Sequence, residues 1–441
     1  MKYCARCLYP ENHPLNIILD DDGICSGCRV HEEKDNLDWP ERFDKLKRIT
    51  DAYRSRSGNN YDCIVPVGGG RDSYFICHVV KNVLKLNPLF VHYNKHYNTR
   101  MGIRNLTYLR TAFNCDLISK VVSPDAVKAL NHATLAERGS MYWHCLAGQT
   151  CFPVQYALFQ KTPLIIWGAH QGVDQVGMFS HLDEVEMTRK YRKEHDLLGL
   201  ELEDVIKQHP QLDNHNLETY RYPSDSELQA VGVRGIYLSN YLRWDSKAQH
   251  ELMIDLYNYE TNEQQRTFDT YNDVDCFHYS GLHDYIKLLK FGYGKVSDHA
   301  SREIRLKRMT REQGQQMVRR YNPVMPTDTD LFLDWMAMTK DELVDHLNRH
   351  RNPNLWTRND AGDWALKNCV AGDVCDAPNI EQARLDAEDQ CTFRVCNNRE
   401  PDHPDRSYII IGKGYVDGKQ SDSPLNFHTE MPKSSAISSE Q

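Results

Sequence analysis

A glycine-rich stretch between an apolar run and an amphipathic segment constrains this chain more than any other feature. Residues 64–67 (Ile-Val-Pro-Val) predict a buried strand, and residues 74–86 predict a helix. Three glycines, residues 68–70, lie between them and are followed by residues 71–73 (Arg-Asp-Ser). Glycines allow a sharp turn and a close approach to a ligand, and the free N–H groups of a helix start suit a phosphate. The stretch predicts a phosphate-binding loop; an ordinary strand-to-helix turn is the alternative.

Two familiar phosphate-binding motifs do not fit this stretch. The Walker A motif needs Lys and then Ser or Thr directly after its last glycine, where this chain has Arg71 and Asp72. The dinucleotide fingerprint G-x-G-x-x-G needs a third glycine where Ser73 stands. Asp72 or Ser73 can instead cap the following helix.

The segments around the loop alternate between strand and helix patterns. Further strands are predicted at residues 88–93, 117–122, 162–168 and 236–238, and helices include residues 40–53, 99–113, 125–138, 244–257, 282–291, 311–321 and 340–350. This alternation predicts an α/β fold with a doubly wound parallel sheet. Ligands of such sheets bind beyond the carboxyl ends of the strands. Residues 68–73, 92–98 and 168–171 then face one crevice, which a helical insertion over residues 171–230 is expected to cover.

Two C-x-x-C pairs near the N-terminus predict a metal site. Cys4 and Cys7 are separated by seventeen residues from Cys25 and Cys28, a spacing typical of a tetrahedral zinc site in which the intervening chain folds back as a hairpin. A closed four-cysteine site indicates structural Zn²⁺; an iron–sulfur cluster or free thiols are alternatives. Four further cysteines have irregular spacing and are weaker candidates for a second metal site: Cys369, Cys375, Cys391 and Cys396.

Length and charge limit the organisation and the partners. A chain of 441 residues suggests two to three domains, and we expect a zinc module at 1–35, the sheet domain at 58–325, a C-terminal extension of unknown role at 326–420 and a disordered tail at 421–441. The net charge of −9 argues against a nucleic-acid partner. The chain has neither an apolar signal region nor an apolar run of membrane-spanning length, so we expect a cytoplasmic protein without a membrane contact.

An aromatic cluster with a thiol lies between the third and fourth predicted strands. Trp143, His144 and Cys145 are expected in a loop that holds a sugar face or presents a nucleophile, with a half-buried aromatic loop as the alternative. Farther along the chain, basic residues after residue 290 include Arg302 and Arg305, which could meet a phosphate.

The glycine loop resembles the PP-loop of the ATP pyrophosphatases, Ser-Gly-Gly-x-Asp-Ser, with Gly68 in place of the first serine. Several segments together resemble the N-acetyl sugar amidotransferase family of lipopolysaccharide and flagellar sugar pathways. The matching features are the paired C-x-x-C motifs and residues 66–73, 143–145, 165–168, 187–191, 290–305 and 310–312. The resemblance covers roughly residues 1–325.

This resemblance implies an ATP-dependent reaction on a sugar. ATP, with Mg²⁺, would adenylylate the carbonyl oxygen of an N-acetyl group and release pyrophosphate, and ammonia would then displace AMP to leave an acetamidino group. The chain shows no evident glutaminase domain. Lys2, rather than a nucleophilic cysteine, comes directly after Met1, and Cys145 lacks a nucleophile-elbow setting. The resemblance therefore implies a separate glutaminase subunit as the partner that supplies ammonia.

The resemblance also assigns roles to individual residues. It implies that Asp72 and Ser73 are catalytic, that Arg71 points to solvent, and that a side chain at Gly69 would fill the space of a phosphate. The nucleotide would bind Gly68, Gly69, Gly70, Arg71, Asp72, Ser73, His92 and Gly168, and the sugar would contact Trp143, His144, Cys145, His170, Arg302 and Arg305.

Two other functions share parts of this sequence pattern. A tRNA-thiolating PP-loop enzyme would also have the loop and the zinc knuckles, and Cys145 and Cys151 could serve its sulfur chemistry. The acidic net charge argues against it, because tRNA binding needs a basic face. A non-catalytic, zinc-stabilised scaffold is supported only by Gly68 in place of serine.

Overall fold

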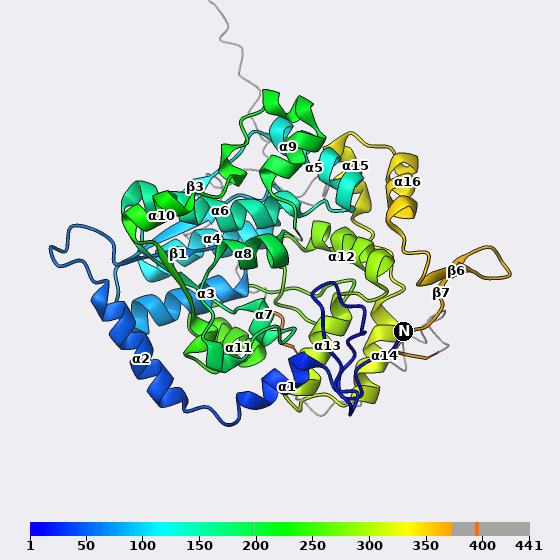
Figure 1. Cartoon of the computed structure of the whole chain (residues 1–441), viewed down its shortest axis with the longest axis horizontal. Coiled ribbons are helices and arrows are strands. Elements are labelled where there is room, and N and C mark those ends of the chain that lie inside the picture. Colours follow the sequence, from blue (N-terminus) through cyan, green and yellow to red (C-terminus); the bar gives the residue numbers. More distant parts are fainter. Residues whose placement is uncertain (198, 373–392, 397–441) are drawn as a thin grey trace, which may run out of the picture.

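The computed structural model describes residues 1–197, 199–372 and 393–396. Its centre is a parallel sheet of five strands in the order β3-β2-β1-β4-β5, as the alternation of strands and helices predicts (Figure 1). The strands are β1 (Cys63–Pro66), β2 (Pro88–Tyr93), β3 (Leu117–Lys120), β4 (Leu164–Trp167) and β5 (Arg234–Tyr237). The chain moves outward from β1 through β2 to β3 and then returns to β4 on the other side of β1, so the winding direction reverses between β1 and β4.

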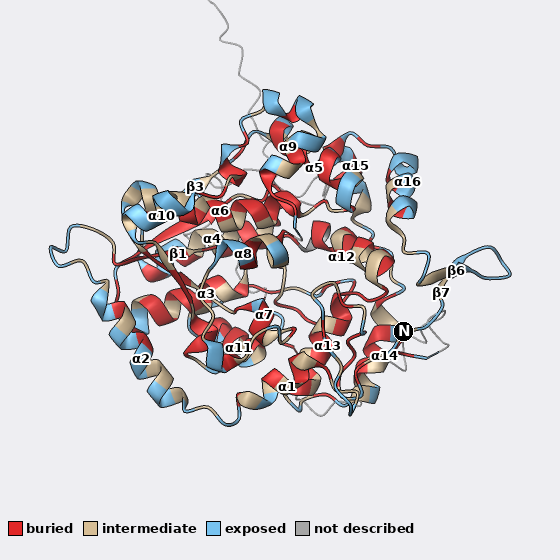
Figure 2. Cartoon of the chain, viewed as in Figure 1, coloured by how far each residue is buried: buried red, intermediate tan, exposed pale blue. Residues whose placement is uncertain are grey.

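Successive residues of β1 face opposite sides of the sheet, so the strand is covered on both faces. Cys63 and Val65 point into a core with α3 (Arg71–Cys77), α4 (Arg100–Phe113) and α11 (Ser246–Tyr257). Ile64 points to the other face, where α6 (Trp143–Gln160) packs on β1, β2 and β4. Burial on both faces explains why these strands read as continuous apolar runs rather than as alternating patterns (Figure 2).

Two helical segments differ from the sequence prediction. The predicted helix at 74–86 begins earlier, at Arg71, and continues after Cys77 as a π-helical turn, His78–Val83. The segment 143–160, expected to begin as a loop, is the long helix α6, and its interior contains Pro153. Because proline is unfavourable inside a helix, the pattern alone gave little indication of α6.

The region between β4 and β5 is a series of short helices. They include α7 (Gln171–Asp174), α8 (Arg189–Tyr191), α9 (Leu202–Gln208) and α10 (Asp225–Val231). Residues from this segment line a cavity at the carboxyl ends of the strands. The expected insertion with bounds 171–230 stays a prediction.

The C-terminal part is helical. It comprises α12 (Phe277–Phe291), α13 (Lys295–Arg305), α14 (Arg311–Tyr321), α15 (Thr329–Met336) and α16 (Lys340–His350), followed by a hairpin of β6 (Trp356–Arg358) and β7 (Trp364–Leu366). Helices α12, α15 and α16 share a core with α5 (Pro124–Arg138). Among the described residues, no helix has the length and apolar character needed to cross a membrane.

The N-terminal residues form a small module that packs against the C-terminal helices (Figure 1). It contains α1 (Ser26–Glu33) and is followed by α2 (Trp39–Ala52). The Leu8 N–H donates to Ser301 Oγ of α13 over 3.2 Å, and Arg311 of α14 donates to the Cys4 carbonyl. The expected domain bounds stay a prediction, as does the tail at 421–441, which lies outside the described residues together with Cys375 and Cys391.

Candidate functional site

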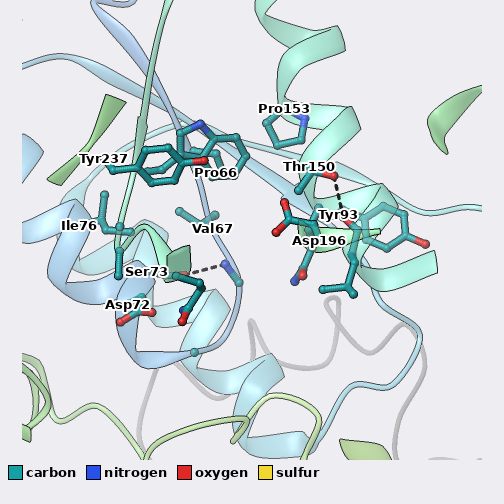
Figure 3. A pocket seen from close by; sticks show the side chains of 18 of the residues that line it. Pro66, Val67, Asp72, Ser73, Ile76, Tyr93, Thr150, Pro153, Asp196 and Tyr237 are labelled. Atoms are coloured by element: carbon teal, nitrogen blue, oxygen red, sulfur yellow. Dashed lines mark hydrogen bonds between the residues drawn. The ribbon is translucent and has the colours of Figure 1, made fainter. Parts of the chain in front are cut away.

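The glycine loop joins the carboxyl end of β1 to the first turn of α3. Gly70 is the N-cap of α3 and has no side chain to cap it, so the N–H groups of the first turn remain available to a ligand. The Gly68 N–H donates to Ser73 Oγ over 2.8 Å, which closes the loop on itself (Figure 3). Ser73 therefore keeps its hydroxyl proton for another acceptor.

Close backbone packing explains why the middle of the loop is glycine. A Cβ on Gly69 would lie 2.3 Å from the carbonyl oxygen of Gly102 in α4, and a Cβ on Gly102 would lie 2.4 Å from Cα of Asp275. Three chain segments are thus stacked with no room for side chains. This corrects the expectation that bulk at Gly69 would occupy phosphate space. A Cβ on Gly70, in contrast, would meet only Asp275 Oδ1, at 3.7 Å.

A cavity of about 410 Å³ opens in front of the loop. It lies beyond the carboxyl ends of β1, β2 and β4, where the winding of the sheet reverses and where ligands of such sheets bind. Figure 3 shows Asp72, Ser73, Tyr93, Asp196 and Tyr237 around it. Its lining includes the loop residues Gly68, Gly70, Arg71, Asp72 and Ser73, with Lys95, Thr150, Gly168, Gln171, Thr188, Tyr191, Arg192, Asn272, Asp273 and Asp275.

A buried ion pair fixes one wall of this cavity. Lys95 Nζ lies 2.6 Å from Asp275 Oδ2, and both side chains are almost fully buried. Burial alone would lower the pKa of Lys95, but the charge of Asp275 outweighs it and raises this pKa. Lys95 is therefore a cation, and Asp275 is held beside the glycine loop. The sequence prediction missed both residues; the Asn-Asp-x-Asp run that ends at Asp275 was the available signal.

Arg71 is buried, which corrects the expectation that it points to solvent. Arg71 is 8% exposed, and its Nη2 lies 2.7 Å from Asp72 Oδ1. Its guanidinium lies over the ring of Tyr271, 4.8 Å from the ring centroid. Asp72 itself is partly exposed at the cavity.

Two predicted histidines lie behind the cavity rather than in its lining. His92 shares a 2.9 Å hydrogen bond between Nδ1 and the Val67 carbonyl, and burial lowers its pKa to about 4. His170 is fully buried, with its ring centroid 4.0 Å from that of Tyr191, a cavity residue. Burial also lowers the pKa of His170 to about 4, so both imidazoles are neutral at pH 7. Gly168, by contrast, lines the cavity.

Trp143, His144 and Cys145 lie in the first turn of α6, not in a loop, and do not line the cavity. Cys145 Sγ is 3.4 Å from His144 Nε2. Burial raises the pKa of Cys145 well above its usual value and lowers the pKa of His144 well below its usual value. The pair is neutral, unlike an activated thiolate–imidazolium pair. Later residues of the same helix, Thr150 and Pro153, reach the cavity instead. A substrate contact for these three residues stays a prediction.

Arg302 and Arg305 lie on α13 and line a second cavity, of about 280 Å³, next to the first. Arg302 donates to Asp269 Oδ2 over 2.8 Å and to Glu303 Oε1 over 2.8 Å. Arg305 lies against the N-terminal module and donates to the Gln175 carbonyl over 2.6 Å. These two arginines line the second cavity and not the first, whereas Arg71 of the loop lines both.

The four N-terminal cysteines form one cluster. Their Sγ atoms all lie within 4.8 Å of one another, and all four residues are buried. The N–H groups of Cys7 and Cys25 point at Cys4 Sγ, and Arg305 Nε lies 3.4 Å from Cys28 Sγ. Four thiolates in a closed, tetrahedral set suit Zn²⁺, and surrounding N–H donors offset their negative charge. The cluster could bind zinc, as the C-x-x-C spacing predicts.

Comparisons with known proteins relate part of this chain to lipopolysaccharide biosynthesis. A sequence profile of the family described as "LPS biosynthesis protein WbpG-like, C-terminal domain" matches residues 265–370, about a quarter of the chain. This segment contains Asn272, Asp273 and Asp275 of the first cavity and all of α13. An uncharacterized protein of Methanocaldococcus jannaschii is 26% identical over 118 residues, 26% of this chain. The match spans 41% of that relative's length.

Proposed function

We propose that this chain is an ATP-dependent amidotransferase that converts the acetamido group of a nucleotide-linked N-acetyl sugar into an acetamidino group in lipopolysaccharide sugar biosynthesis. The observation that supports this most is the open glycine loop at the winding reversal of the sheet, facing a cavity of about 410 Å³. The similarity of residues 265–370 to a lipopolysaccharide biosynthesis domain points to the same pathway.

In this proposal, ATP lies with its phosphates along the loop. The free N–H groups at the start of α3 donate to phosphate oxygens, and the helix dipole favours their negative charge. Ser73 accepts from the Gly68 N–H, so its hydroxyl can donate to a phosphate oxygen. Asp72 at the cavity edge offers a carboxylate oxygen to Mg²⁺, which would neutralise phosphate charge.

The reaction balances in two steps. The acetamide oxygen attacks the α-phosphorus of ATP and pyrophosphate leaves, giving an adenylylated imidate. Ammonia then adds to the imidate carbon, and AMP leaves with the original oxygen. An amide is a poor electrophile with a poor leaving group, and adenylylation corrects both. A protein nucleophile is not required. The chain's residues orient the two substrates and stabilise the charge that develops on the phosphates.

A glutaminase partner that supplies the ammonia is part of this proposal. The purified chain should use ammonium salts directly and should use glutamine only when a glutaminase subunit is added. Product formation is followed by mass spectrometry, because replacing the acetamide oxygen by NH changes the mass and adds a positive charge.

The decisive measurement is sugar-dependent ATP–pyrophosphate exchange. Asp72→Asn should lower the exchange rate by about a hundredfold or more, the scale for losing one group that stabilises transition-state charge. Asp44→Asn, which changes an exposed carboxylate in α2 that lines neither cavity, is the matched control and should exchange like the wild type. Equal exchange rates in the two variants would refute the assignment of the loop.

The tRNA-thiolation alternative gains no support from the structure. It depended on Cys145 and Cys151, and both thiols are fully buried. Burial raises the pKa of Cys151 to about 11, and neither sulfur belongs to a residue that lines the first cavity. The scaffold alternative depended on Gly68, but Gly68 contributes its N–H to the closed loop without needing a side chain.

A further inference from the structure

The second cavity adjoins the first through a shared wall. Residues Arg71, Ala169, Gln171, Asn272 and Asp273 line both cavities. The rest of the second cavity is built by segments far apart in the sequence: the N-terminal module, residues 174–175, residues 244–246 and residues from α13. A chamber of about 280 Å³ beside the nucleotide cavity is large enough to hold part of a second substrate.

Basic side chains outnumber acidic ones in this lining. Five cationic residues face three aspartates: Lys34, Arg71, Lys295, Arg302 and Arg305 against Asp174, Asp273 and Asp298. Each of the five cations has a partner in the fold, such as Lys34 with Asp174 at 2.5 Å, Arg302 with Asp269 at 2.8 Å and Arg71 with Asp72 at 2.7 Å. Of these five cations, Arg71 alone has buried nitrogen donors with no hydrogen-bond partner among the described residues.

Two donors of Arg71 are buried without a hydrogen-bond partner in the described part of the chain. They are Nε and Nη1; only Nη2 is engaged, by Asp72. Leaving charged donors buried and unpaired is costly, and a bound anion is one partner that can satisfy them. The contact with the Tyr271 ring holds the guanidinium in place, and Arg302 lies over the same ring at 5.3 Å.

The neighbouring wall residue has an uncommon backbone conformation. Asp273 has φ = 55°, in the left-handed region, and its carboxylate lies 3.5 Å from Lys295 Nζ. Non-glycine residues in this region are sparse and cluster at ligand sites, although aspartate tolerates it better than most. Arg71 and Asp273 thus mark the boundary between the two cavities.

We propose that the second cavity binds the phosphate group of the acceptor substrate, and that Arg71 contacts this phosphate with its Nε and Nη1 donors. The sugar then extends past Asp273 into the first cavity, where its acetamido group meets ATP. This inference rests on the proposed function for the identity of the acceptor, but the cavity itself can be tested by binding alone.

The test measures binding of UDP-N-acetylglucosamine by calorimetry, with and without a non-hydrolysable ATP analogue. Arg71→Met should weaken binding of this probe by about tenfold or more, the loss expected for a charge-assisted hydrogen bond. Its effect on the affinity for the ATP analogue should be smaller. Arg56→Met, which removes an exposed arginine, is the matched control and should change neither affinity.

A second variant tests the space of the cavity rather than the charge of Arg71. Ser246 lines only the second cavity, so Ser246→Leu should exclude the probe while the ATP analogue binds as in the wild type. Ser246→Ala should bind both ligands normally. Melting temperatures of the two Ser246 variants show whether the protein folds with leucine at this position. If Ser246→Leu does not fold, the Arg71→Met variant still tests the proposal.

The outcomes separate the two proposals. Unchanged probe affinity in Arg71→Met and Ser246→Leu would overturn the second-cavity site, as would equal losses of probe and ATP-analogue affinity in both. Neutral N-acetylglucosamine should bind far more weakly than the UDP-linked sugar; equal affinities would also overturn it. Failure of the wild type to bind ATP would instead refute the proposed reaction while leaving the probe result interpretable.

Discussion

Gly69 and Gly70 are adjacent in the loop but have different structural tasks. Gly69 packs directly on the backbone of Gly102, whereas Gly70 faces Asp275 with room for one carbon. Gly69→Ala should therefore displace α4 and lower the free energy of unfolding by about 1–3 kcal/mol, the usual cost of overpacking. Gly70→Ala is the matched control and should lose less than half as much in urea denaturation. Equal losses would show that loop conformation, not packing, selects glycine here.

His181 illustrates how burial couples stability to pH. It is fully buried beside Trp39, and burial lowers its pKa from 6.5 to about 4, with Lys34 and Arg42 adding to this effect and Asp174 opposing it. The unfolded chain takes up the proton near pH 6.5 and the folded chain only near pH 4. Stability from this residue is therefore complete above pH 6.5 and is lost as the pH falls to 4.

His181→Phe should flatten the pH dependence of stability between pH 6.5 and 4, which urea denaturation would show as a change of about 3 kcal/mol in the free energy of unfolding. His132→Phe, which changes an exposed histidine, should leave the slope as in the wild type. A wild-type slope in His181→Phe would mean that its imidazole is protonated equally in both states.

Cys145 is expected to be dispensable for the chemistry. Its thiol is fully buried, its pKa is raised well above the usual value by burial, and it does not line the first cavity. Cys145→Ser should keep the ammonia-dependent rate within about tenfold of the wild type, whereas loss of a true nucleophile costs orders of magnitude more. ATP-analogue binding, measured alongside, distinguishes a chemical defect from misfolding.

At the scale of elements, we expect the N-terminal module to depend on a bound metal. We expect about one zinc per chain by elemental analysis, as four buried thiols in a closed cluster require. Cys25→Ser should lose the zinc and lower the melting temperature, because metal binding contributes directly to folding. Cys115→Ser changes a half-buried thiol outside the cluster and should retain the metal. Full zinc content in Cys25→Ser would refute the site.

The elements that could be predicted are those whose pattern is local. β1 was predicted at 64–67 and observed at Cys63–Pro66, and α14 and α16 occupy the predicted residues. The C-x-x-C pairs predicted a cluster because ligand spacing is itself a local feature. α6 was missed because Pro153 opposes helix formation, and tertiary burial on the sheet overrides that preference. α13 was read only as a basic run because its partners lie far away in the sequence.

At the scale of the whole molecule, the parallel sheet and its crevice followed from the alternation of strands and helices. The second cavity could not be predicted, because its walls come from Arg71 and from residues within 9–34, 169–175, 244–246, 272–273 and 295–306. No spacing rule relates such segments. For the same reason Arg71 was expected at the surface: only the packed positions of Tyr271 and α13 show that it is enclosed.

The Lys95–Asp275 pair connects the sheet to the segment that precedes the C-terminal helices. Lys95→Met should lower the free energy of unfolding by about 3–5 kcal/mol, because it leaves a buried carboxylate without a counter-charge. The double variant Lys95→Met/Asp275→Asn should recover much of this loss. Urea denaturation of the two variants and of Asp275→Asn completes the cycle, and a loss below about 1 kcal/mol in Lys95→Met would contradict the pairing.

The contact between Arg305 and the cysteine cluster has a consequence for how the chain is made. Cys28 and Arg305 are separated by 277 positions, so a ribosome releases all four cysteines long before it adds the arginine that packs against their sulfurs. The two C-x-x-C pairs can therefore bind a metal ion while most of the polypeptide is still being translated. Gly27 has no side chain to fill the space that Arg305 and the Gln175 carbonyl occupy. Arg305 of α13 can therefore pack there once it has been synthesised. The N-terminal module can therefore complete its packing only after α13 has been synthesised, and this packing completes the wall of the second cavity.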